Sequence, residues 1–448
     1  DVLGSRGLGD VYKRQEVCRV LSKKTYDRLG ETIYQTTLTN GLKVLMVPKV
    51  GFHKTFAIMT TDYGAMDNEF IPRGQTTPVR FPDGIAHFLE HKLFEKKDHD
   101  AFDLFGKYGA SANAFTGFTQ TSYLFATTSH LKENLEILLD FVQDPYFTAA
   151  TVNKEKGIIG QEIQMYDDDP GWQSYFGMIG HLYPKEPLHI DIAGTVDSID
   201  KITADDLYAA YNTFYHPSNM SLIIVGQLDP EETLAWVTAN QDGKSFAPNA
   251  PITRIPSPQA RPSDIVPATT RHLTLTRPKV NIGLRGFDMV PAGRTGLAYS
   301  VAVSLMFDLL FNDTGDNYLR LYDANVIDDS FGYDFQVQRG AHFAQLAGDT
   351  DQPEQFASEL TAILKDAPAQ LAAAKPQFDL VKREAIGRIV GAINSVEGIA
   401  NQYDGPLFDG ATIFDELAIL EQLTFDELLT AAKAFLDQSQ ATVYTILP

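Results

Sequence analysis

Two histidines and a glutamate at close spacing are the residues of this chain best suited to chemistry. His87, Glu90 and His91 form the pattern H-x-x-E-H inside an apolar run over residues 84–94. If that run is helical, His87 and His91 lie one turn apart on the same face and can bind one metal ion. Glu90 then projects beside them, where it can take a proton from a water molecule instead of binding the metal. A hydrolytic zinc site has three protein ligands and an open position, so the pattern predicts a further ligand from elsewhere in the chain.

A second segment, residues 152–166, offers two carboxylates in a pattern typical of a helix. Glu155 and Glu162 are seven positions apart, which is two helical turns, so both carboxylates share one face. Taken alone, two acids on one helix face are usually solvated surface. Beside the H-x-x-E-H pattern they become candidates for the same site.

Charge and cysteine content limit the class of protein. The formal net charge of −21 argues against a nucleic-acid partner, which calls for a basic surface. The single cysteine, Cys18, excludes an internal disulfide framework and favours a reducing, cytoplasmic compartment. No stretch approaches the roughly 20 apolar residues of a membrane span, so no membrane partner is expected.

The 448 residues favour two domains of roughly 200 residues each. Residues 1–15 lack an initiating Met and an apolar core, and we interpret them as a non-native leader. Residues 16–240 are predicted to form the zinc-bearing catalytic domain. Residues 241–270 contain six prolines without apolar periodicity, which predicts an extended linker. Residues 271–448 are predicted to form a homologous, non-catalytic domain, because they contain no H-x-x-E-H pattern.

A repeated pattern indicates that the two domains are duplicates. Residues 202–207 match residues 423–428, and each segment places acidic residues in the first turn of a Thr-capped helix. Apolar strands follow at the same distance, over residues 221–225 and 442–446. A shared offset of 221 positions (423 − 202) across helix, turn and strand is typical of an internal repeat.

Hairpins and runs of helices without strict alternation predict an α+β fold, with a largely antiparallel sheet and helices on one face in each domain. Asn40-Gly41 between apolar runs indicates a hairpin. Further strands are expected at residues 56–61, 121–127 and, as a pair, 332–346. Further helices are expected at residues 131–142, 172–182, 295–310, 354–364 and 377–401.

The spacing of the site residues resembles a known family. His87-x-x-Glu90-His91 followed by Glu162 after 71 positions (162 − 91), with Glu155 two turns earlier, resembles the inverzincins. These are the pitrilysin, insulinase and mitochondrial processing peptidase family. The likeness runs from about residue 35 to the end of the chain, is strongest before residue 226, and is closest to short bacterial members with two homologous domains.

The resemblance implies a zinc site with assigned roles. One Zn²⁺ per chain would be bound by His87, His91 and Glu162, with Glu90 as the general base. Glu155 would be a carboxylate behind the ligands that orients the site. The implied activity is that of a zinc-dependent endopeptidase.

The resemblance also implies how substrate would bind. Asn113, Ala114 and Phe115 lie in a segment similar to the family's substrate-binding edge strand, which would bind unfolded peptides or short polypeptides as an added β-strand. The two domains would face each other as a clamshell and enclose the peptide in a chamber. A homodimer, or a heterodimer with a paralogous chain, is expected by analogy.

One departure from the family's pattern keeps other interpretations open. Active relatives offer an Arg and, seven positions later, a Tyr from the second domain, whereas this chain has Ala324 and Phe331 there. Arg320 and Tyr333 lie nearby and are the candidates to replace them as substrate-binding residues. The departure favours a zinc-binding but non-proteolytic assembly or peptide-binding subunit, and the intact Glu90 opposes it. A hydrolase or lyase for small molecules is a third interpretation, which the edge strand and the second domain oppose.

Overall fold

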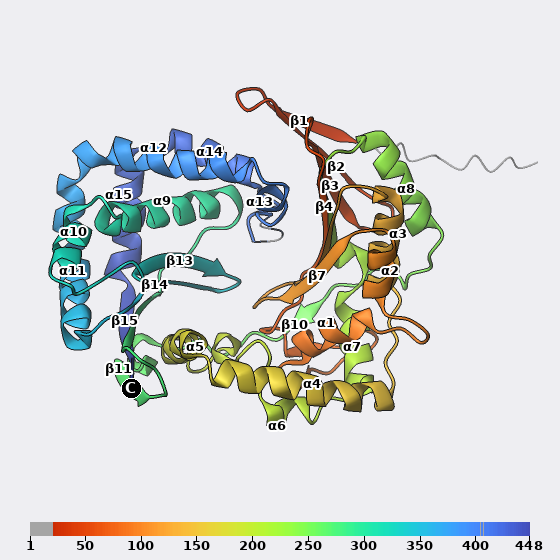
Figure 1. The fold of residues 1–448 in the computed structure, drawn as a ribbon, viewed down its shortest axis with the longest axis horizontal. Coiled ribbons are helices and arrows are strands. Elements are labelled where there is room, and N and C mark those ends of the chain that lie inside the picture. The colour runs from red at the N-terminus through yellow and green to blue at the C-terminus, as the bar shows by residue number, and fades with distance from the viewer. Residues whose placement is uncertain (1–20, 404, 406) are drawn as a thin grey trace, which may run out of the picture.

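The computed structural model describes residues 21–403, 405 and 407–448, so the predicted leader and Cys18 lie outside the described residues. Two lobes lie side by side, and each combines a sheet with helices (Figure 1). The fold is therefore α+β, as predicted.

The first lobe is built on a seven-stranded sheet in the order β1-β2-β3-β9-β4-β8-β7. Neighbouring strands are antiparallel except β3 and β9. The predicted Asn40-Gly41 turn lies between β2 and β3, and Gly41 has φ of 94°, a backbone conformation that favours glycine. The strands are β1 (Ser22–Tyr26), β2 (Glu31–Thr37), β3 (Lys43–Pro48), β4 (Thr55–Thr61), β7 (Ser111–Thr116), β8 (Thr121–Thr127) and β9 (Met220–Gly226).

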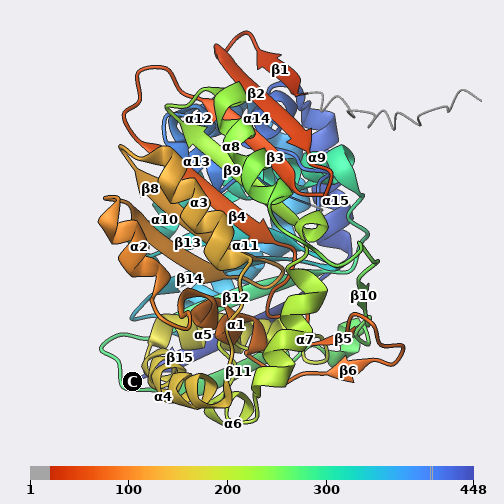
Figure 2. The same cartoon turned by 90° about the vertical axis from the view of Figure 1, so that its right-hand side faces the viewer.

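Helices cover one face of this sheet, and Figure 2 shows α2, α3 and α8 lying over it. The core beneath them includes the fully buried side chains of Phe88, Phe125 and Leu138. The helices of this lobe are α1 (Ile85–Phe94), α2 (Ala101–Lys107), α3 (Leu131–Val142), α4 (Ala149–Asp167), α5 (Pro170–Leu182), α6 (Val196–Ile199), α7 (Ala204–Phe214) and α8 (Pro230–Asp242), with 3-10 turns η1 (Pro187–His189) and η2 (Pro217–Asn219).

The second lobe repeats the topology of the first. Its five strands have the order β11-β15-β12-β14-β13, and the one parallel pair, β11 with β15, occupies the position of β3 with β9. The predicted repeat is confirmed, because Thr203 caps α7 before β9 and Thr424 caps α15 before β15. The strands are β11 (Ala268–His272), β12 (Lys279–Gly286), β13 (Gly332–Gln338), β14 (Ala341–Asp349) and β15 (Ser439–Leu447). The helices are α9 (Gly293–Phe311), α10 (Asp316–Asp323), α11 (Pro353–Ala373), α12 (Lys375–Ala392), α13 (Val396–Ala400), α14 (Ile413–Gln422) and α15 (Phe425–Asp437).

The sequence predicts helices on one face of each sheet. In the structure, a helix of the other lobe also packs on the second face of each sheet. Helix α5 of the first lobe packs on β12 and β15, where Met178 lies so close to Gly283 that a Cβ there would be 2.4 Å from its sulfur. Helix α13 packs on β4 and β9, where Ile399 joins a cluster with Ile58 and Val225. The central strands are buried on both faces, so each lobe contributes to the core of the other.

The single helix predicted over residues 377–401 is wrong. Helix α12 ends at Ala392, and a separate helix, α13, begins at Val396. Just before α13, the Ser395 side chain accepts a hydrogen bond from the backbone N–H of Gly398 at 3.1 Å. A serine at this position satisfies an N–H group that the first turn of a helix leaves unpaired, so it starts a new helix.

The segment predicted as a linker, residues 241–270, carries short elements, of which β10 (Thr253–Arg254) pairs with a strand of the first lobe and β11 with a strand of the second. The partner of β10 is β5 (Glu69–Ile71), which pairs in turn with β6 (Val79–Arg80). A 3-10 turn, η3 (Pro262–Asp264), and the start of β11 follow within the same segment.

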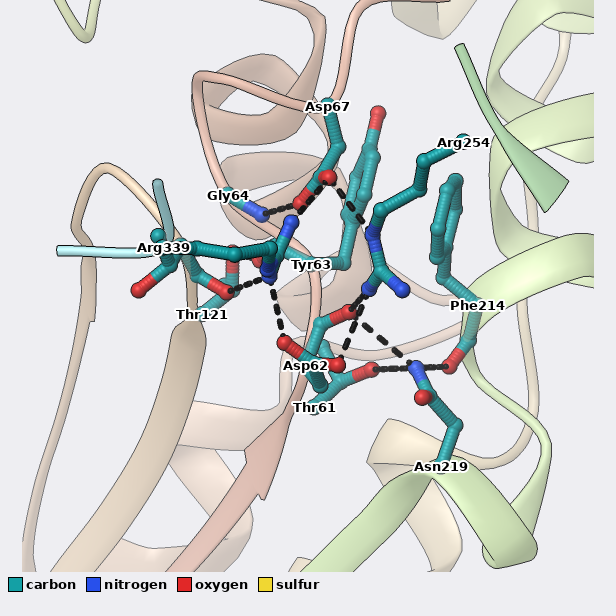
Figure 3. Close-up of polar contacts among 11 residues, drawn as sticks. Thr61, Asp62, Tyr63, Gly64, Asp67, Thr121, Phe214, Asn219, Arg254 and Arg339 are labelled. Carbon is teal, nitrogen blue, oxygen red and sulfur yellow. Dashed lines mark hydrogen bonds and ion pairs between the residues drawn. The ribbon is translucent and has the colours of Figure 1, made fainter. Parts of the chain in front are cut away.

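An ion-pair cluster joins the lobes at the tip of the β13–β14 hairpin (Figure 3). Arg339 reaches into the first lobe, where its guanidinium lies 2.5 Å from Asp62 and 2.5 Å from Asp67. It also donates to the backbone carbonyl of Thr119 at 3.2 Å. Arg254 of β10 shares both carboxylates, at 3.0 Å from Asp62 and 2.7 Å from Asp67. The cluster ties the second lobe and the β10 segment to the same loop of the first lobe.

Helix α9 meets the length and composition of a membrane span, and it is the one helix among the described residues that does so. The expectation that no stretch approaches a span is wrong on those two measures. Of the 18 most apolar consecutive residues of α9, 61% are buried. Among them, Val303, Met306 and Phe307 belong to the core of the second lobe. Burial in that core accounts for its apolar composition.

Candidate metal centre

Helix α1 places the two histidines of the H-x-x-E-H pattern. Its apolar side chains Phe88, Leu89 and Leu93 are fully buried, which fixes the rotation of the helix. Gly84 begins the helix with φ of 88°, and a Cβ there would lie 2.4 Å from the carbonyl oxygen of Ala193. Only glycine fits this close approach, so the start of α1 is held against that loop.

The structure brings together His87, His91 and Glu162, the three residues that the family resemblance implies as ligands. A candidate ligand atom from each of the three side chains lies within 4.8 Å of the others, and no other such group occurs in the described part of the chain. Nε2 of His87 is 3.7 Å from Oε1 of Glu162, and Nε2 of His91 is 3.4 Å from Oε2. Helix α4 carries the glutamate and packs directly on α1.

These separations fit a tetrahedral ion better than a set of hydrogen bonds. Zinc binds imidazole nitrogen and carboxylate oxygen at about 2.0–2.2 Å, so the ligand atoms of a tetrahedral site lie about 3.3–3.5 Å apart. The distance of 3.4 Å from His91 to Oε2 matches that spacing, and the distance of 3.7 Å from His87, which runs to the other oxygen, Oε1, is slightly longer. Two imidazoles and one carboxylate are also a donor set that suits zinc and leaves a position open.

Burial prepares His87 to act as a neutral ligand. Burial, followed by the nearby charge of His91, lowers the pKa of His87 to about 4. A neutral imidazole keeps a lone pair that a metal ion can bind at any pH above that value. Nδ1 of His87 is buried and has no hydrogen-bond partner among the residues that the structure describes.

Glu155 lies behind His91. Its Oε1 is 3.2 Å from Nδ1 of His91, and its Oε2 is 3.7 Å from the fully buried Lys92 ammonium. Burial acts to raise the pKa of Glu155, but the hydrogen bond from His91 and the charges of His91 and Lys92 bring it below its usual value. The carboxylate thus turns Nε2 of His91 toward Glu162, as outer carboxylates do for metal-binding histidines.

Glu90 lies beside the cluster and is fixed by a residue that the sequence analysis missed. Its Oε2 accepts a hydrogen bond from Oγ1 of Thr116 at 2.6 Å. Burial raises the pKa of Glu90, and the bond from Thr116 opposes that shift. The alternation along residues 113–116 could have indicated Thr116, since it puts Ala114 and Thr116 on one face of the strand.

The predicted edge strand is β7, the last strand of its sheet. Its side chains alternate, with Asn113 and Phe115 exposed and Ala114 and Thr116 half-buried. The N–H of Ala114 donates to the side-chain oxygen of Asn113 at 2.9 Å. An edge strand can pair with an added strand, and β7 presents its edge next to Thr116, the residue that contacts Glu90.

Arg320 and Tyr333 do not join this group. Arg320 forms an ion pair with Glu359 at 2.9 Å, and the Tyr333 hydroxyl donates to Asp308 at 2.9 Å. Both partners belong to the second lobe, and α10, which carries Arg320, lies on the side of that lobe away from α1 (Figure 1). Their contacts stabilise the second lobe and do not support a role in substrate binding.

A cavity of about 1020 Å³ lies between the lobes, but the metal cluster is not part of its lining. Thr119 lines it from the turn between β7 and β8, and Arg339 from the turn between β13 and β14. Asp62 lines it from the loop after β4, and Tyr403 from the region after α13.

Comparison with known proteins identifies the class. Residues 81–193 match the family model described as Insulinase (Peptidase family M16), and residues 201–375 match that described as Peptidase M16 inactive domain. A protein of Bacillus subtilis (strain 168) named uncharacterized zinc protease YmfH is 44% identical over 94% of this chain and 98% of its own length. The chain therefore belongs to peptidase family M16, as the resemblance implied.

Solved structures agree with this assignment. The crystal structure of an M16-like peptidase from Alicyclobacillus acidocaldarius has a TM-score of 0.89 and 31% identity, covering 93% of this chain and 98% of that one. The periplasmic protease PqqL of Escherichia coli has a TM-score of 0.66 at 16% identity, covering 100% of this chain and 48% of that one. At that identity the second likeness shows the fold alone, here as one half of a longer chain.

Proposed function

We propose that this M16 peptidase is a zinc-dependent endopeptidase that hydrolyses unfolded peptides or short polypeptides. The observation that carries the proposal is the convergence of His87, His91 and Glu162 at tetrahedral spacing, with the unligated Glu90 beside them. A subunit that only binds peptide has no use for a base in that position. Bound there, zinc would lower the pKa of water toward about 7 and polarise the scissile carbonyl.

Residues of the chain would supply proton transfer, positioning of the base and binding of the peptide. Glu90 takes a proton from the attacking water as its oxygen bonds to the scissile carbon, and delivers that proton to the leaving amine nitrogen as the C–N bond breaks. Thr116 holds the carboxylate in place for both transfers. The free edge of β7 pairs with the peptide backbone, which provides affinity with little demand on side chains.

Removing the metal provides the test of this function. We expect the full chain to cleave a mixture of quenched fluorescent peptides, to lose that activity after treatment with a chelator, and to regain it when zinc is restored. The measurement is the rate of fluorescence increase, together with the zinc content of each sample. Cleavage that persists in protein shown to be free of metal would contradict the proposal.

Replacing Glu155 by glutamine tests whether this residue orients His91 or binds the metal itself. The amide can still accept the hydrogen bond from His91 but carries no charge, so we expect turnover to fall about 10- to 100-fold while zinc content changes less. The measurements are steady-state cleavage and metal analysis, with Glu136→Gln on the surface of α3 as the control. Loss of zinc as complete as that of a ligand variant would instead make Glu155 a ligand.

A non-proteolytic subunit is the second candidate. This alternative is favoured by the contacts that Arg320 and Tyr333 make within the second lobe. Because of these contacts, the two residues are poorly placed to replace the substrate-binding Arg and Tyr that active relatives offer from the second domain. Under this alternative the metal site would remain and the peptide mixture would be bound but not cut. For either function we propose pairing with a second copy or a paralogous chain, since in PqqL this fold makes up half of a longer chain.

A further inference from the structure

One tyrosine contacts the candidate metal ligand directly and has no part in the mechanism above. Tyr166 lies one helical turn beyond Glu162 on α4, and its hydroxyl donates a hydrogen bond to Oε1 of Glu162 at 2.7 Å. Oε1 also lies 3.7 Å from Nε2 of His87, whereas Oε2, the other carboxylate oxygen, lies 3.4 Å from Nε2 of His91 and accepts no bond from Tyr166. The two oxygens of Glu162 therefore have different surroundings before any metal binds.

The phenol ring of Tyr166 is held in place from outside its own helix. It stacks on the indole of Trp172 in α5, with ring centroids 4.4 Å apart and planes within 13°. The indole N–H donates to the carboxylate of Asp191, which also accepts from the backbone N–H of Ala193 at 2.9 Å. Ala193 is the residue against which Gly84 starts helix α1. One chain of contacts thus links Tyr166 to the loop that fixes the two histidines.

We propose that Tyr166 is a positioning residue, which occupies Oε1 of Glu162 so that the carboxylate is presented to the metal through Oε2 alone. The inference rests on the proposed zinc site. A carboxylate can bind zinc through one oxygen or through two, and binding through two would add a fifth ligand that crowds the position a hydrolytic site must keep open. A rigid donor on one oxygen removes that second mode, as partners behind metal ligands commonly do.

The test compares metal binding in Tyr166→Phe with that of the unchanged full chain. The substitution removes the hydroxyl and keeps the ring that stacks on Trp172. We expect zinc to bind about 10-fold more weakly, measured by competition with a chromophoric chelator. We also expect the visible bands of the Co²⁺-substituted variant to lose intensity, because a carboxylate bound through two oxygens raises the coordination number from four to five.

The matched control is Tyr322→Phe, which removes a hydroxyl from an exposed tyrosine on α10 of the second lobe. It should leave both readouts at the values of the unchanged chain. If Tyr166→Phe also binds zinc with unchanged affinity and an unchanged Co²⁺ spectrum, the hydrogen bond only stabilises helix α4 and the inference is overturned. If the unchanged chain binds no zinc, the proposed site itself fails, which distinguishes the two results.

Discussion

Replacing Glu90 by glutamine will abolish peptide cleavage and leave the zinc content near that of the unchanged chain. The amide oxygen can still accept the hydrogen bond from Thr116, so the helix and the metal ligands keep their places. It cannot take a proton from water, and losing a general base costs about 10²- to 10⁴-fold in rate. The measurements are single-turnover cleavage of the quenched peptides and metal analysis of the same preparation.

A matched control is Glu231→Gln, which makes the same chemical change at an exposed position of α8. It should cleave at the rate of the unchanged chain. Equal activity in the Glu90 and Glu231 variants would show that Glu90 is not the base, and the peptidase mechanism would then have to be abandoned.

Replacing Glu162 by glutamine should weaken zinc binding, whereas replacing Glu90 leaves the zinc content unchanged. The substitution keeps the shape of the side chain and removes the one negative charge among the three proposed ligands. We expect zinc affinity to fall by at least about 100-fold, more than for a residue behind the ligands. Cleavage should fall with it and recover in part at high zinc concentration. The measurement is chelator competition followed by activity across a zinc titration.

Asp167→Asn is the matched control for this variant, since it neutralises an exposed carboxylate at the end of the same helix. Its zinc affinity should equal that of the unchanged chain. Were the Glu162 variant also to bind zinc as tightly as the unchanged chain, the third ligand would have to be assigned to another residue.

The local part of the site could be predicted from the sequence because helical spacing determines it. His87 and His91 share a face of any helix that contains them, and the buried Phe88 and Leu89 show which face turns inward. The place of Glu162 came from a resemblance in spacing, since helical periodicity alone does not bring α4 against α1. Tyr166 was within reach of the same argument, because it lies one turn beyond Glu162 on the same face.

The parts that sequence reasoning missed depend on contacts between distant segments. Arg320 and Tyr333 were candidates by their position in the chain, but Glu359 and Asp308 bind them within the second lobe. Nor does any local pattern indicate that Arg339 joins a carboxylate cluster of the first lobe.

Helix ends show the same limit. The helix predicted at residues 354–364 continues as α11 past Pro368 to Ala373. The helix predicted at residues 377–401 instead stops at Ala392 and restarts after Ser395. Packing on neighbouring helices and capping by a single side chain determine where these helices end. The spacing of apolar residues in the sequence indicates neither of these contacts.

The most direct test of the metal site is anomalous diffraction, recorded on both sides of the zinc absorption edge, from crystals of the full chain grown with zinc. We expect one strong peak bounded by Nε2 of His87, Nε2 of His91 and a carboxylate oxygen of Glu162, each at about 2.0–2.2 Å. A peak that lies elsewhere, or one at the histidines with the Glu162 carboxylate turned away, would contradict the proposed metal site.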